Sequence, residues 1–375
     1  MSLLADLQTL VECESPSSDL AAVARSAEVV AEVGSTRLGV EPERIVLEGR
    51  THLRWRIGSG PSRVLLVGHH DTVWPLGSLA THPCVVRDGV LRGPGCFDMK
   101  AGLVMAFHAA AGLDGVTLLV TGDEELGSPS SRGLIEDEAR LAEAALVLEA
   151  SADGGALKTE RKGVSLYEVR VVGRAAHAGL EPERGVNATL ELAHQALLVS
   201  ALSDPALGTT VTPTAGRAGT TTNTVPAEGS FAVDVRVRTV AEQDRVDAAM
   251  RALSPVLPGA VVEVSGGPNR PPLEAAASAA LFERTRALAV RLGLPQPVAT
   301  AVGGASDGNF TAGVGTPTLD GLGAVGGGAH ADDEHVLVAE LPRRTALLRA
   351  LLEELLDPRL VPPTNHLATT GAVRP

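Results

Sequence analysis

The sequence predicts an α/β protein, and two observations carry this prediction. Three short apolar runs, at residues 64–68, 116–121 and 145–148, have the length and composition of buried strands. Continuous apolar runs suit strands that are covered on both faces of a parallel or mixed sheet. Helix-like stretches separate these runs, at 99–111 and 133–143. Strands that alternate with helices predict a central sheet between layers of helices.

Apolar residues at helical spacing predict a first helix at the N-terminus, which ends before Pro16 because proline cannot continue a helix. The pattern then changes, and alternating apolar residues over 165–171 and 231–237 predict half-exposed strands. A helix predicted over 185–201 joins them in a β-α-β unit, which indicates a smaller inserted domain. A long helix over 275–292 restores the first pattern. We therefore expect three segments: the first part of a main domain (1–162), an inserted domain (163–271) and the second part of the main domain (272–375).

The composition excludes two classes of partner. The chain of 375 residues has a formal net charge of −13, whereas nucleic acid or an anionic membrane would require a basic face. No apolar run reaches the roughly 18 residues that a membrane-spanning helix needs. Cys13, Cys84 and Cys96 show no disulfide or metal-binding spacing, and the first residues lack the features of a signal peptide. We expect a cytoplasmic protein that contacts neither nucleic acid nor membrane.

Histidines and carboxylates follow the ends of the predicted strands. Ligands of open α/β sheets bind at the carboxyl ends of the strands, so side chains from separate strands would meet at one edge. Imidazole and carboxylate groups without thiolates suit a metal centre with nitrogen and oxygen ligands. The residues are His69 and Asp71 after the first run, Asp98 after a glycine-rich turn, Glu124 and Glu125 after the second run, Glu149 after the third, and His330 after the glycine-rich stretch 321–328.

Each of these residues alone has an ordinary structural explanation. Asp98 could cap the helix that follows it, and a pair such as Glu124 and Glu125 is typical of a solvated turn. Glu149 is harder to explain in this way, because a carboxylate at the end of a buried run needs a partner. His70 would point to the opposite face of its strand from the preceding histidine, so we expect a packed or surface side chain there. The order of all the residues together favours a metal site.

The motifs that contain these residues resemble those of a known hydrolase family. They are 68–73 (GHHDTV), 93–100 (GPGCFDMK), 123–128 (DEELGS), 173–179 (GRAAHAG), 185–188 (GVNA), 223–226 (NTVP), 234–236 (DVR) and 328–330 (GAH). They are similar, in the same order, to motifs of the zinc-dependent glutamate carboxypeptidase, aminoacylase and succinyl-diaminopimelate desuccinylase family, especially its glutamate carboxypeptidase-like members. The resemblance implies a catalytic domain with a central mixed sheet flanked by helices, and an inserted ferredoxin-like α+β dimerisation domain.

The resemblance also implies a role for each residue of the site. Two zinc ions would be bound, one by His69, Asp98 and Glu149 and the other by Asp98, Glu125 and His330. A bridging carboxylate suits paired ions about 3.5–4 Å apart, and cobalt or manganese could replace zinc. Asp71 would accept a hydrogen bond from the His69 ring and fix its tautomer. Glu124 would be the general base.

Four residues outside the metal motifs are implied to contact substrate. In the family, the residue that matches His177 reaches the partner subunit's active site and stabilises the oxyanion, which implies a homodimer. Asn223, Arg236 and Arg270 match residues that hold substrate carboxylates in glutamate-releasing members, and a guanidinium binds a carboxylate bidentately. The match of Arg270 is weaker, and a surface charge near a hinge is the alternative for it. A surface histidine is the alternative for His177.

We therefore predict a two-metal hydrolase that cleaves an amide bond next to a free carboxylate in a small peptide or N-acyl amino acid. A carboxypeptidase that releases a C-terminal amino acid such as glutamate is the first hypothesis. An N-acyl amino acid deacylase or a desuccinylase with the same metal centre is the second. The third is a non-catalytic relative that only binds, and it would predict a missing ligand or a replaced Glu124. Every position is filled.

Overall fold

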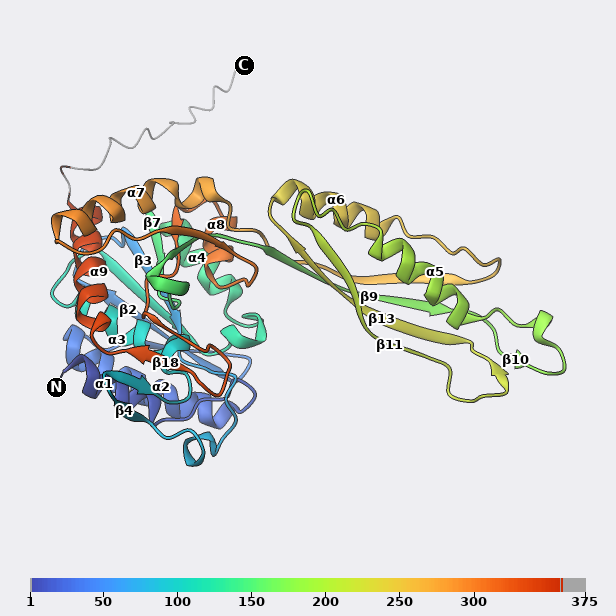
Figure 1. Ribbon diagram of the computed structural model, residues 1–375, viewed down its shortest axis with the longest axis horizontal. Helices are drawn as coiled ribbons and strands as arrows, with labels where there is room; N and C mark the ends of the chain where they lie inside the picture. The colour runs from blue at the N-terminus through green and yellow to red at the C-terminus, as the bar shows by residue number, and fades with distance from the viewer. Residues whose placement is uncertain (1, 358, 360–375) are drawn as a thin grey trace, which may run out of the picture.

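The computed structural model describes residues 2–357 and 359 of the chain, and these residues form two lobes (Figure 1). The larger lobe contains a six-stranded sheet of order β1-β2-β6-β3-β7-β16. Strands β6, β3, β7 and β16 run parallel, whereas β2 pairs antiparallel with both β1 and β6, so the sheet is mixed. The strands are β1 (Glu43–Leu47), β2 (Arg50–Ile57), β3 (Val64–His69), β6 (Val116–Thr121), β7 (Ala144–Val147) and β16 (Thr318–Leu319).

Helices cover both faces of this sheet, because side chains alternate between the two faces along each strand. Leu66 and Leu118 face the larger core beneath α1, α2, α3, α7 and α9. Leu65 and Leu119 face a second core against α4 and α8. The helices are α1 (Leu3–Val11), α2 (Leu20–Leu38), α3 (Ala101–Ala110), α4 (Arg132–Leu141), α7 (Ala275–Arg291), α8 (Gly308–Gly313) and α9 (Glu340–Leu356). The predicted α/β class is confirmed.

One helix begins later than its sequence pattern predicts. The pattern places its start at Met99, but α3 begins at Ala101. Residues 96–100 form an irregular turn in which Asp98 and Met99 have non-helical backbone dihedral angles. The apolar pattern does not distinguish this turn from a helix, because its buried residues Phe97 and Met99 face the same core. The turn carries Asp98 into the site described below.

The smaller lobe is a four-stranded antiparallel sheet of order β11-β13-β9-β14 with two helices (Figure 1). Its elements follow one another as β-α-β-β-α-β, the order of a ferredoxin-like unit, and enclose a core of their own. They are β9 (Gly163–Val172), α5 (Ala188–Ser200), β11 (Thr210–Ala218), β13 (Glu228–Val237), α6 (Val240–Arg251) and β14 (Val261–Arg270). The lobe begins and ends close to the predicted boundaries, which remain a prediction.

Short strands complete the two lobes. The antiparallel sheet β17-β18-β5-β4 brings the segment after residue 325 beside the turn before Asp98. Within residues 2–357, no helix combines the length and the apolar character that a bilayer crossing demands. The remaining strands are β4 (Val85–Arg87), β5 (Val90–Arg92), β8 (Leu157–Arg161), β10 (Ala176–His177), β12 (Thr224–Val225), β15 (Ala299–Val302), β17 (Gly326–Gly327) and β18 (His335–Leu337).

Candidate metal centre

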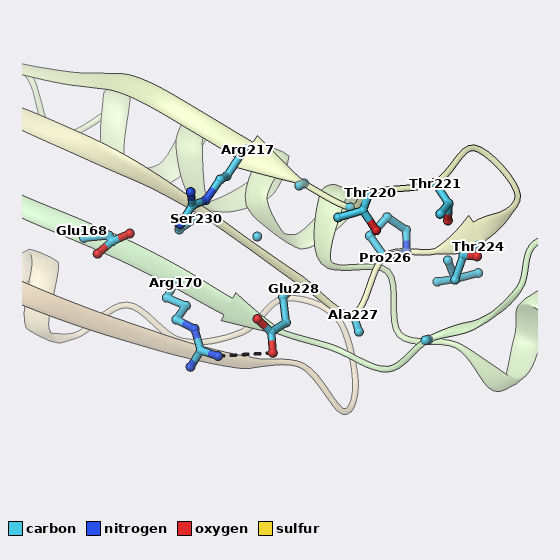
Figure 2. Close-up of a pocket in the computed structure, with 15 residues that line it drawn as sticks. Glu168, Arg170, Arg217, Thr220, Thr221, Thr224, Pro226, Ala227, Glu228 and Ser230 are labelled. Carbon is cyan, nitrogen blue, oxygen red and sulfur yellow. Dashed lines mark ion pairs between the residues drawn. The ribbon is translucent and has the colours of Figure 1, made fainter.

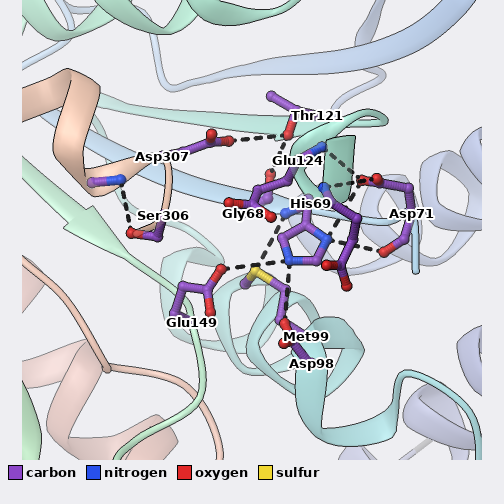
Figure 3. A network of polar contacts seen from close by, with 12 residues as sticks. Gly68, His69, Asp71, Asp98, Met99, Thr121, Glu124, Glu149, Ser306 and Asp307 are labelled. Atoms are coloured by element: carbon purple, nitrogen blue, oxygen red, sulfur yellow. Dashed lines mark hydrogen bonds and ion pairs between the residues drawn. The ribbon is translucent and has the colours of Figure 1, made fainter. Parts of the chain in front are cut away.

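Three neighbouring parallel strands deliver the side chains of the site to one edge of the larger sheet. His69 is the last residue of β3, and Glu124 and Glu125 lie in the short turn after β6. Glu149 follows β7 by two residues. Because β3 pairs in parallel with both β6 and β7, the carboxyl ends of the three strands lie side by side. The edge predicted from the sequence is therefore the edge at which these residues meet (Figure 3).

The five predicted ligands converge as two groups of three that share Asp98. In one group, Nε2 of His69 lies 3.3 Å from Oδ1 of Asp98 and 3.5 Å from Oε1 of Glu149. In the other, Nε2 of His330 lies 3.2 Å from Oδ2 of Asp98 and 3.1 Å from Oε2 of Glu125. Each oxygen of the shared carboxylate thus faces a different group. A bridging carboxylate between two cations has this arrangement.

The side chains of the two groups are arranged to bind cations and not to satisfy one another by hydrogen bonds. His69 Nε2 and Asp98 Oδ1 are buried and lack a hydrogen-bond partner among the described residues, although they face each other. Buried polar atoms in natural proteins nearly always have a hydrogen-bond partner, so two unpartnered atoms that can both ligate a metal and that face each other mark a place for an ion. Nitrogen and oxygen donors without thiolates suit zinc, cobalt or manganese.

The pKa shifts of the two histidines show how negative the surroundings of the site are. Hydrogen bonds to Asp98 and Glu125 raise the pKa of His330 to about 10. Burial alone would lower the pKa of His69, but the carboxylates around the ring outweigh burial and raise that pKa well above its ordinary value. Divalent cations would supply the positive charge that these carboxylates require.

Glu124 belongs to neither group, although it lies beside both. Its side chain is buried, and its Oε1 lies 3.0 Å from Nη2 of Arg270. Burial raises the pKa of Glu124 well above its ordinary range, although the cation of Arg270 opposes the shift. A carboxylate next to the ligands but free of them is what a general base requires.

Asp71 contacts His69 in a different way from the one predicted. Nδ1 of His69 lies 3.0 Å from the backbone carbonyl of Asp71, whereas Oδ1 of the carboxylate lies 3.5 Å away. That carboxylate accepts hydrogen bonds from the backbone N–H groups of Glu124 and Glu125, both at 3.2 Å. Asp71 therefore orients the His69 ring chiefly through its main chain and anchors the turn of Glu124 through its side chain. His70 is buried, as expected.

A cavity of about 460 Å3 lies over the two groups and is lined by both lobes. The larger lobe contributes the carboxylates, and the smaller lobe contributes Arg236 from β13 and Arg270 from the end of β14. Arg236 pairs with Asp234 through two hydrogen bonds of 2.8 Å. Arg270 is buried, so the alternative interpretation of this residue as a surface charge is wrong. Besides Glu124, its Nη2 contacts Ser128 and Asp307, at 2.9 and 3.3 Å.

His177 and Asn223 lie apart from these groups. His177 is on β10 and Asn223 just precedes β12, the strand that pairs with it. Figure 1 shows β10 at the end of the smaller lobe that is remote from the larger lobe. Neither residue lines the cavity of its own chain.

A second hollow lies on the sheet of the smaller lobe, away from the two ligand groups (Figure 2). It has a volume of about 500 Å3 and is lined by polar side chains, among them Arg170, Arg217 and Glu228. Arg170 forms ion pairs with Glu228 and Glu263. No group of metal-ligating side chains lies there among the residues that the structure describes.

Sequence patterns did not identify several residues that support the site. Arg161 is buried, bonds Asp320 at 2.6 Å and points Nη2 to within 3.6 Å of Glu149. Asp307 lies in the glycine-rich loop 303–309 and accepts from Thr121 and Ser128. Glu334 lies four residues after His330 and bonds the turn of Asp98. The acidic run before Glu334 was the only local signal, and such a run is more often a solvated loop.

Comparisons with known proteins agree with this geometry. Residues 65–354 match the model of peptidase family M20/M25/M40. Carboxypeptidase G2 from Pseudomonas sp. (strain RS-16) is 32% identical over 293 residues, which cover 74% of this chain and 70% of that protein. Succinyl-diaminopimelate desuccinylase from Xanthomonas oryzae pv. oryzae (strain MAFF 311018) is 30% identical over 304 residues, which cover 72% of this chain and 77% of that protein.

Solved structures with the same fold include aminopeptidase PepT from Bacillus cereus ATCC 10987. Its TM-score is 0.74 at 23% identity, over 94% of this chain and 98% of that one. The YXEP protein of Bacillus subtilis, a dinuclear metal binding peptidase, has a TM-score of 0.61 at 15% identity, over 93% of this chain and 96% of that one. At these identities the likeness concerns the fold alone.

Proposed function

The chain belongs to peptidase family M20/M25/M40, and on that premise we propose that it is a two-metal carboxypeptidase that releases a C-terminal amino acid such as glutamate. The observation that carries the proposal is the pair of ligand groups that share Asp98 beneath a cavity with arginine in its wall. The family supports peptidase or amidohydrolase chemistry in general, and the first relative supports the choice of a carboxypeptidase.

His69, Asp98 and Glu149 would hold one zinc ion, and Asp98, Glu125 and His330 the second. Cobalt or manganese would suit the same donors. When bound, the ions supply Lewis acidity toward the amide carbonyl and lower the pKa of the attacking water. Glu124 takes a proton from that water and transfers it to the nitrogen of the leaving amine. Arg270 holds Glu124 in place through its 3.0 Å ion pair, besides lining the cavity where substrate would bind.

His177 and Asn223 would act in the active site of a second copy. They lie at the end of the smaller lobe away from their own metal groups, which supports a contribution to the partner's site (Figure 1). The helix α5 of that lobe exposes Leu190 and Leu197, 54% and 72% accessible, and β11 is an edge strand. An exposed apolar helix beside an unpaired sheet edge is a surface suited to a homodimer.

Arg236→Ala tests the carboxylate clamp. The guanidinium lines the cavity from the smaller lobe and would bind the free carboxylate of the substrate bidentately. Its loss should raise KM for carboxylate substrates by about 10–100-fold, the range of a lost charge-assisted hydrogen bond, while amidated analogues lose little. Steady-state kinetics on matched acid and amide substrates measure the difference. Equal effects on both would contradict the clamp. Arg170→Ala, on the same sheet outside the cavity, is the control.

A second function has support from the desuccinylase relatives. A desuccinylase or N-acyl amino acid deacylase would use the same metal groups and the same clamp, and would differ only in the acyl half of the substrate. Release of free amino acid from a panel of dipeptides, N-acyl amino acids and N-succinyl diamino acids, with zinc added, separates the two. Preferred cleavage of dipeptides supports the carboxypeptidase, and preferred cleavage of acyl or succinyl substrates supports the alternative.

A further inference from the structure

Glu334 accepts four hydrogen bonds at a buried position next to the metal groups. Its side chain is 3% accessible. Oε1 accepts from the backbone N–H groups of Phe97 and Asp98, at 2.8 and 3.0 Å. Oε2 accepts from the backbone N–H of Gly95 at 2.9 Å and from Nε1 of Trp74 at 2.6 Å. Each oxygen of this carboxylate thus accepts two hydrogen bonds from other segments of the chain.

These four bonds join three of the segments that carry the proposed ligands. Trp74 lies on the loop that follows His69, five residues along the chain. Gly95 and Phe97 belong to the turn that ends in Asp98, and Glu334 itself lies four residues after His330. One carboxylate therefore connects the loop of each terminal histidine with the turn of the bridging carboxylate.

The turn needs such an acceptor because it is not a helix. Asp98 and Met99 depart from helical dihedral angles, so the N–H groups around them are not aligned as in a regular helix. A carboxylate is suited to the position, since it is an acceptor only and the four neighbours are all donors. A glutamine amide would turn an NH2 group toward two of these donors.

We propose that Glu334 is a positioning residue for the metal centre: it sets the direction of the Asp98 carboxylate so that one oxygen faces each group of ligands. This inference rests on the proposed function, because it assumes that the two ligand groups bind metal. Glu334 does not reach the metal groups itself, so its effect passes through the backbone of Asp98. Residues that hold metal ligands in this indirect way commonly change metal affinity by about 10–100-fold when they are replaced.

Glu334→Gln should therefore weaken zinc binding by about 10–100-fold. Titration of metal-free protein with zinc against a competing chelator measures both affinities without recourse to activity. Glu138→Gln is the matched control: Glu138 is equally buried, at 4%, but its carboxylate pairs with Arg54 and Arg56 away from the site. The control should bind zinc as wild type does, even if its melting temperature falls.

Each outcome of the zinc titrations either supports or overturns the inference. Weaker zinc binding by Glu334→Gln alone supports it, whereas wild-type affinity in that variant, or equal losses in both variants, overturns it. If wild-type protein binds no zinc, the proposed function fails together with the inference. If Glu334→Gln does not fold, hydrogen exchange in metal-free wild type decides instead. Slow exchange at the amides of Gly95, Phe97 and Asp98 supports the bonds to Glu334, and exchange at unprotected rates overturns them.

Discussion

Replacement of Glu124 by glutamine should abolish turnover while leaving the metal content close to that of wild type. Glutamine keeps the shape of the side chain but cannot take a proton from water. General acid–base catalysis typically contributes about 10²–10⁴-fold, and we expect kcat to fall by the upper part of that range because the same group serves both proton transfers. The ligands are untouched, since Glu124 belongs to neither metal group.

Two measurements on Glu124→Gln separate its role from site assembly. Metal analysis of the purified variant reports zinc per chain, and steady-state kinetics report kcat. Activity near that of wild type would exclude Glu124 as the base. A loss of zinc together with activity would show that Glu124 acts through assembly of the site. Glu138→Gln, which removes another buried carboxylate paired with arginine, should change neither quantity.

His177→Ala should lower kcat by about 10²–10³-fold, the effect of losing one donor to the oxyanion. In a single chain this result would be unexpected, because His177 does not line the cavity and β10 lies at the end of the smaller lobe that is remote from the larger lobe (Figure 1). In a homodimer with crossed contributions, the imidazole of one copy would reach the site of the other. Zinc content should not change, since His177 is in neither ligand group.

Mixed dimers test whether His177 acts across the subunits. A hybrid of His177→Ala with Glu124→Gln contains one site with both residues intact, provided that each site takes its histidine from the other copy. Random exchange of subunits should then restore about a quarter of the sites, since half of the dimers are hybrids with one complete site each. Native mass spectrometry measures the fraction of hybrids. Hybrid formation without recovered activity would contradict the crossed contribution.

The strands and the metal residues could be predicted because their signals are local. A buried parallel strand is a continuous apolar run, and the residue that follows it points to the ligand-binding edge. This reasoning places His69, the Glu124–Glu125 pair and Glu149 at one edge of the sheet, whereas the resemblance to the family assigned the individual ligands. Asp98 required the resemblance to the family, because a carboxylate before a helix is as typical of a cap as of a ligand. The start of α3 was predicted two residues too early, because the apolar pattern does not distinguish the turn before it from a helix.

Contacts between side chains and distant segments could not be predicted from the pattern. Glu334 is separated by more than 200 residues from the turn that it bonds, and nothing near it in the sequence indicates that turn. Arg270 has a polar, proline-rich neighbourhood typical of a surface hinge, yet β14 ends beneath Glu124 and buries it. The carboxylate of Asp71 turns to the N–H groups of the Glu124 turn because that turn closes over it. Each of these contacts depends on how loops pack together, and the spacing of apolar residues does not predict loop packing.

The central claim is that two divalent cations share the carboxylate of Asp98. Anomalous diffraction at the zinc absorption edge, from crystals of zinc-loaded protein, tests this claim most directly. The account predicts two peaks about 3.5–4 Å apart, one bounded by His69, Asp98 and Glu149 and the other by Asp98, Glu125 and His330. A single peak at full zinc loading, or peaks away from Asp98, would contradict it.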